Sequence, residues 1–61
     1  MIPLELNRRS AKLGCALAIE NGVVYIVEME HKSIVFGGIL TEVAEELTEL
    51  EEAEYENDKG K

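Results

Sequence analysis

The stretch CALAIENGVVYIVEME, residues 15–30, decides the fold, because two apolar runs meet there at Asn21-Gly22. Asparagine and glycine tolerate the positive φ angles of a type I′ turn, so this dipeptide between apolar runs predicts a β-hairpin with a two-residue loop. In that register Glu20 pairs with Val23, and the pairing runs back to Cys15 opposite Glu28. The hairpin is the element from which the rest of the chain can be placed.

Side chains alternate along a strand, so the hairpin register predicts two faces, and both are apolar. A free-standing antiparallel sheet normally has one polar face, so two apolar faces require two covers. One face is lined by small residues beside large ones, and a helix is expected in this trough: Ala16, Ala18, Val23, Tyr25, Val27 and Met29. The opposite face is predicted to be a homo-oligomer interface: Leu13, Leu17, Ile19, Val24, Ile26 and Val35. The alternative cover for this face is the N-terminal segment folded back over it, with Ile2, Leu4 and Leu6 as the covering side chains.

The segments that flank the hairpin suggest further strands. Residues 2–6 alternate apolar and polar side chains, which is typical of a short edge strand that begins near Pro3. Residues 7–10 then predict a turn, and Gly14 in the strand that follows indicates either a bulge or a close approach of another backbone. Residues 30–33 predict a second, looser turn, and residues 33–36 predict a third strand that continues to about residue 39. If the loop of this turn also has two residues, Ile34 and Phe36 would join the face that carries Tyr25.

The C-terminal third predicts one amphipathic helix. Leu40, Val43, Leu47 and Leu50 recur at spacings of three and four, so a helix is expected from about residue 42 to residue 54. Thr41 is its predicted N-cap, and Gly37-Gly38 forms the corner between sheet and helix. The predicted fold is α+β: a three- to four-stranded antiparallel β-meander followed by one C-terminal amphipathic α-helix. A single domain spans residues 1–55, followed by a flexible polar tail at residues 56–61.

Length and composition limit the chemistry available to the chain. A domain of 61 residues buries little surface, and oligomerisation is one usual source of extra stability. Cys15 is the only cysteine and His31 the only histidine. An internal disulfide is therefore excluded, and a nucleophile and base pair is not expected. His31 is interpreted as a solvated turn residue. We expect no enzymatic activity, no cofactor and no metal site.

The N-terminus and the apolar runs suggest the compartment. Met1-Ile2-Pro3 lacks the basic start of a signal peptide, and the longest apolar runs are of strand length. A cytoplasmic protein without membrane contact is expected.

The net charge of −7 is concentrated at the C-terminal end of the chain. Residues 42–61 carry nine acidic side chains against Lys59 and Lys61. Solvated helices usually mix charges of both signs, whereas like charges three or four residues apart each cost roughly 0.2–0.5 kcal/mol. Either these carboxylates only keep the helix hydrated, or they bind a basic partner, with weak divalent-cation binding a third alternative. The candidate partner-binding residues are Glu42, Glu45, Glu46, Glu49, Glu52 and Glu56.

A small basic group near the N-terminus gives the main alternative function. Arg8, Arg9 and Lys12 are opposed locally only by Glu5. Three cations offer few contacts to nucleic-acid phosphates, and the negative net charge of the chain repels the phosphates. They are equally suited to pairing with carboxylates, within one chain or between two.

These patterns predict a non-enzymatic, homo-oligomeric interaction protein that binds a basic protein partner and inhibits or regulates it. Small viral inhibitors of host proteins and antitoxins use negative charge on a rigid helix in this way, but no motif ties the chain to either group. The alternatives are a homo-oligomeric nucleic-acid-binding regulator that uses the basic segment, and a purely structural assembly subunit.

Overall fold

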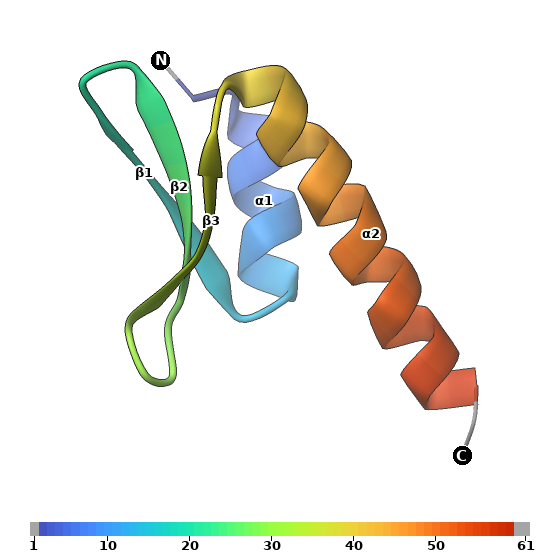
Figure 1. The fold of residues 1–61 in the computed structure, drawn as a ribbon. Helices are drawn as coiled ribbons and strands as arrows, with labels where there is room; N and C mark the ends of the chain where they lie inside the picture. Colours follow the sequence, from blue (N-terminus) through green and yellow to red (C-terminus); the bar gives the residue numbers. More distant parts are fainter. Residues whose placement is uncertain (1, 60–61) are drawn as a thin grey trace.

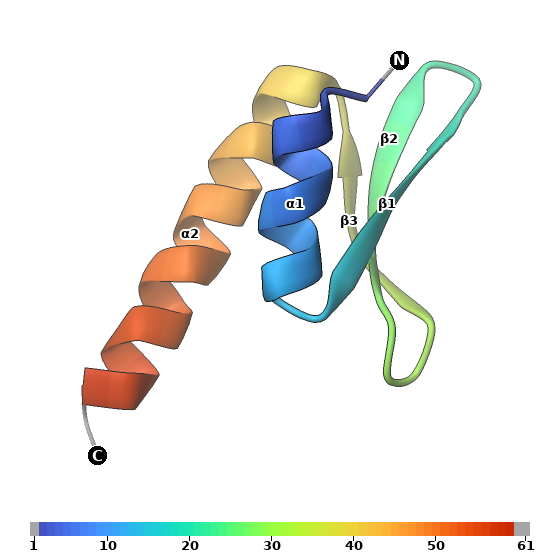
Figure 2. The ribbon, with the colours of Figure 1, turned by 180° about the vertical axis from the view of Figure 1, so that it is seen from behind.

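The computed structural model describes residues 2–59, with the side chains of residues 2–54, and it is an α+β fold of two layers. Three strands form one antiparallel sheet in the order β1-β2-β3, and both helices lie against the same face of it (Figures 1 and 2). The three-stranded meander and the C-terminal helix were predicted, whereas the N-terminal helix was not. The elements are α1 (Leu4–Lys12), β1 (Cys15–Glu20), β2 (Val23–Glu28), β3 (Ser33–Gly38) and α2 (Leu40–Lys59).

The predicted hairpin of β1 and β2 is confirmed in every pair. Glu20 lies opposite Val23 and Cys15 opposite Glu28, with no shift between them. Asn21 has a φ of 53° and Gly22 a φ of 79°, which are the two left-handed residues that a type I′ turn requires.

A β-bulge between β2 and β3 changes the face on which the predicted third strand places its side chains. Glu28 pairs with Ser33 across a four-residue loop, and Val27 pairs with Ile34, but Ile26 pairs with Phe36. Val35 is therefore the extra residue of the bulge. The bulge moves Phe36 to the face of Ile26, so the prediction that Phe36 lies beside Tyr25 is wrong, while Ile34 does lie on the Tyr25 face.

The core lies on the sheet face opposite to the one expected. Four fully buried residues form it, two from β2 and two from α2: Val24, Ile26, Val43 and Leu47. Leu13, just after α1, and Leu17 of β1 pack against these residues, and so does Phe36 of β3. This face offers larger side chains than the trough of alanines and glycine, so covering it removes more apolar surface from water. Val24 and Ile26 are thus not available for oligomer contact, and that prediction is wrong.

Segment Leu4–Lys12 is a helix, where an edge strand and a turn were predicted. Pro3 precedes the first turn, and its carbonyl accepts hydrogen bonds from the amides of Leu6 and Asn7 at 3.1 and 3.3 Å. Gly14, with a φ of 76°, ends the helix as a left-handed residue and is not a bulge. A period-two pattern of only three apolar residues was too short to override these helix signals, and Leu4 is 63% exposed.

Helix α2 is longer than predicted at both ends. The amide of Ile39 donates to Oε1 of Glu42 at 3.1 Å, so Glu42 caps the helix start and Thr41 lies inside the first turn. The helix continues to Lys59, so the first residues of the predicted tail extend it, and residues 60–61 lie outside the described part of the chain. None of the helices in the described part combines the length and apolarity needed to cross a bilayer.

The face of the sheet away from the helices is open and mostly apolar. Tyr25 lies at its centre, directly opposite Gly37, and a Cβ at Gly37 would lie only 2.9 Å from two carbons of the Tyr25 ring. The aromatic ring therefore covers the glycine of the neighbouring strand. We call this surface the open face, and its residues are Ala16, Ala18, Val23, Tyr25, Val27 and Ile34.

Candidate functional site

Helix α2 presents a carboxylate surface to solvent. Its apolar stripe faces the core, as the spacing of Val43 and Leu47 predicts. Figures 1 and 2 show that its C-terminal half extends beyond α1 and the sheet. Four of the six predicted partner-binding residues are exposed, and we call them the α2 acidic surface: Glu42, Glu45, Glu49 and Glu52. The side chain of Glu46 is half-buried, and that of Glu56 lies outside the described side chains.

The α2 acidic surface carries uncompensated charge. In the part of the chain with described side chains, the only ion pair made by α2 joins Glu51 to Arg9. Glu42, Glu45, Glu49 and Glu52 follow one another at spacings of three, four and three residues, so three like-charge pairs together cost about 1 kcal/mol. Glu42 offsets part of this cost by capping the positive end of the helix.

Arg9 and Glu51 join the two helices. The guanidinium donates from Nε to Oε2 of Glu51 at 2.9 Å and from Nη2 to Oε1 at 2.9 Å, and Nη2 also donates to the hydroxyl of Thr48 at 3.0 Å. This two-bond geometry is the strong form of an arginine–carboxylate pair. Hydrogen bonding by Arg9 lowers the pKa of Glu51, and the same bond raises the pKa of Arg9. The sequence is compatible with pairing of the N-terminal cations within one chain or between two, and Arg9 pairs within the chain.

The engagement of Arg9 reduces the basic group proposed for nucleic-acid contact. Arg8 and Lys12 are exposed on α1, but the donors of Arg9 are directed to α2. Arg8 and Lys12, which form no ion pair with the described side chains, make a weak footprint for phosphates beside a strongly acidic helix.

Replacing Glu51 by glutamine is expected to lower the free energy of unfolding by about 1 kcal/mol at neutral pH, because the pair is partly exposed to water. The pKa of Glu51 is lowered in the folded chain relative to its ordinary value of 4.5. The stabilisation is therefore complete above this value and is lost as the pH falls through the lower, folded-state pKa. Urea unfolding of Glu51→Gln and wild type should differ at pH 7 and converge in acid.

The exposed Glu49 supplies the control for this comparison. Glu49→Gln removes the same charge from the same helix without breaking the contact to Arg9, so we expect a change below about 0.5 kcal/mol. Equal losses in the two variants would contradict a stabilising role for the Arg9–Glu51 pair.

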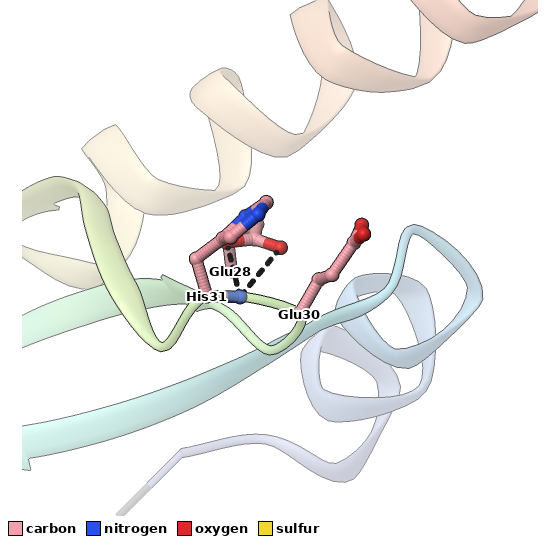
Figure 3. A group of neighbouring side chains, drawn as sticks. All are labelled: Glu28, Glu30 and His31. Carbon is pink, nitrogen blue, oxygen red and sulfur yellow. Dashed lines mark hydrogen bonds and ion pairs between the residues drawn. The ribbon is translucent and has the colours of Figure 1, made fainter.

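A second group of polar side chains gathers at the loop between β2 and β3 (Figure 3). Glu28 is the last residue of β2. The backbone amide of His31 donates hydrogen bonds to its Oε1 at 3.1 Å and to its Oε2 at 2.9 Å. The His31 ring places Nδ1 3.3 Å from Oε2 of Glu28, and Glu30 projects beside them. One possible ligand atom from each of the three side chains lies within 4.8 Å of the other two. The sequence predicts the turn and its exposed histidine, but the contact between Glu28 and His31 was not predicted. The pattern that could have indicated it is two glutamates and a histidine around a four-residue loop.

Cys15 is half-buried. Its thiol donates a weak hydrogen bond to the carbonyl of Leu13 at 3.7 Å. Burial raises the pKa of the thiol, and the charges of Glu28 and Glu54 raise it further. A protonated thiol is a poor nucleophile and a poor metal ligand. Among the described residues, no hydrogen bond joins Cys15 to His31.

The structure places some of the predicted oligomer-interface residues in the core and others at the surface. The residues that remain exposed are Ile19, at 50%, and Val35, at 47%, and both lie at the margins of the sheet. Ile34, at 65%, belongs to the open face and was not among the predicted set. The exposed apolar side chains of the sheet are therefore divided between its margins and the open face.

These features define a class: a two-layer α+β protein with an acidic helix on one side of the sheet and an open apolar face on the other. No protein-family model, curated protein or solved structure matches the chain.

Proposed function

We propose that the protein is a non-enzymatic interaction protein whose α2 acidic surface binds a basic macromolecular partner and thereby inhibits or regulates it. The observation that carries this proposal is the run of exposed carboxylates along one helix, none of which forms an ion pair with the described side chains. Their mutual repulsion is relieved when lysine or arginine side chains approach. Their field also attracts a positively charged partner and increases the rate of encounter.

The position of α2 suits this role. The helix is fixed at its N-terminal half by Val43 and Leu47 in the core, and the Arg9–Glu51 pair holds it further along. A charged helix that is already ordered loses little conformational entropy on binding. A groove lined by cations, such as one that binds nucleic-acid phosphates, would accept this surface and then be closed to its usual ligand.

Self-association through the open face completes the proposal, with a second copy of this chain as the occupant. Three strands of six residues span about 15 by 20 Å, or roughly 300 Å². Stable interfaces bury roughly 800 Å² per partner, so a weak, concentration-dependent dimer is expected. Because the helices lie on the opposite face of the sheet, such a dimer leaves both α2 acidic surfaces free (Figure 1).

Defined probes separate this proposal from nucleic-acid binding. A fluorescent peptide rich in lysine and arginine is expected to bind the protein at about 50 mM salt and to bind about tenfold more weakly at about 200 mM, as exposed charges are screened. A short DNA duplex should show no binding under the same conditions. Binding of the duplex without binding of the peptide would contradict the proposal and favour the basic segment of α1.

A further inference from the structure

The loop between β2 and β3 brings metal-ligating side chains together without help from α2. Glu28 is fixed at the end of a strand, and Lys32, with a φ of 57°, turns the chain back into β3. Glu30 and His31 lie between them. The loop is short and hydrogen-bonded to the Glu28 carboxylate, so the three side chains are held at one end of the sheet.

The spacing of the Glu28 and His31 ligand atoms is that of a coordination sphere. Zinc binds nitrogen and oxygen ligands at about 2.0–2.1 Å in a tetrahedron, which puts two ligands about 3.3–3.4 Å apart. Nδ1 of His31 and Oε2 of Glu28 are 3.3 Å apart. Glu30 is exposed, and one of its carboxylate oxygens lies within 4.8 Å of a possible ligand atom of Glu28 and of His31, so a side-chain rotation completes the set.

The charge of the cluster favours a cation. Among the described residues, no lysine or arginine forms an ion pair with Glu28 or Glu30. The carboxylate of Glu28 is largely shielded, with its side chain 29% exposed, whereas the His31 side chain is 74% exposed and open to an incoming ion. Imidazole together with carboxylates selects zinc and similar transition metals over magnesium or calcium, which take oxygen ligands.

We propose that Glu28, Glu30 and His31 form a binding site for a divalent transition-metal ion of the zinc class, with water in the remaining coordination position. This site is independent of the α2 acidic surface, so either can fail without the other. Cys15 is not a ligand, because its thiol is directed to the carbonyl of Leu13.

The test is calorimetric titration of the metal-free protein with zinc chloride alone, in a buffer that does not chelate. The expected result is saturable binding of one zinc ion per chain. His31→Gln and Glu30→Gln should each weaken binding by at least about tenfold, by analogy with the loss caused by removing groups that support metal ligands. Cys15→Ser and Glu45→Gln are the matched controls and should bind within twofold of wild type.

Several results would overturn the site. Wild-type protein without saturable zinc binding would do so, as would a His31→Gln variant that binds as tightly as wild type. A loss of binding in Cys15→Ser would place the metal on the thiol, and equal affinity for magnesium would show a diffuse acidic surface. Circular dichroism of each variant confirms that the comparison is made between folded chains.

Discussion

Ile26→Ala is expected to lower the free energy of unfolding by about 2–4 kcal/mol, because the side chain is fully buried in the core between β2 and α2 and its loss leaves a cavity. A chain of 61 residues has a total stability of about 3–9 kcal/mol. The substitution therefore removes a large part of what holds the fold together. Urea unfolding followed by circular dichroism measures the loss directly.

Ile34→Ala is the control that tests which face of the sheet is covered. Ile34 lies on the open face of β3 and is 65% exposed, so its truncation should change stability by less than about 0.5 kcal/mol. A larger loss at Ile34 than at Ile26 would mean that the helices cover the Tyr25 face. Equal losses would mean that both faces are covered in solution.

Val27→Lys is expected to abolish self-association. Val27 lies on the open face of the central strand, so a lysine there brings a charge into the middle of the proposed contact. Across a two-fold axis the same residue occurs twice, and two desolvated like charges should raise the dissociation constant at least about 100-fold. Light scattering over a dilution series should show a concentration-dependent mass for wild type and a constant monomer mass for the variant.

Leu4→Lys is the matched control for this experiment. Leu4 is 63% exposed on α1, away from the open face, so the same change of charge and polarity there should leave the dilution behaviour unchanged. If wild type is a monomer at every concentration, or if Leu4→Lys dissociates it as well, the open face is not the self-contact.

The local elements were predictable where a strong short-range pattern exists. Asn21-Gly22 specified the turn and hence the register of β1 and β2. The recurrence of Val43 and Leu47 specified which side of α2 is buried. In both cases the physical cause acts within a few residues, so the local sequence is sufficient to predict the feature.

Helix α1 was missed although its signals were present. Pro3 before the first turn, Glu5 within it, Lys12 in the last turn and Gly14 beyond the end are helix boundary residues. The alternation of Ile2, Leu4 and Leu6 favours a strand, but it spans only five residues and is a weaker pattern than these boundary residues.

The choice of sheet face depends on contacts that no local pattern specifies. A bulge at Val35 brings Phe36 onto the side of Ile26, and the bulge has no distinct signal in the sequence. The Arg9–Glu51 pair joins residues 42 positions apart, and the Glu28–His31 contact depends on the loop conformation. Consequently the acidic surface was predictable from charge spacing, whereas the identity of the exposed sheet face and the loop cluster were not.

The most direct test of the central claim compares two triple variants with the same net charge. Glu45→Gln, Glu49→Gln and Glu52→Gln on α2 change the net charge from −7 to −4, and so do Glu5→Gln, Glu20→Gln and Glu30→Gln elsewhere. If the α2 acidic surface binds basic partners, only the α2 variant should lose affinity for the basic peptide, by about tenfold at low salt. Equal weakening in the two variants would show that net charge alone attracts the peptide, and would contradict a specific binding surface on α2.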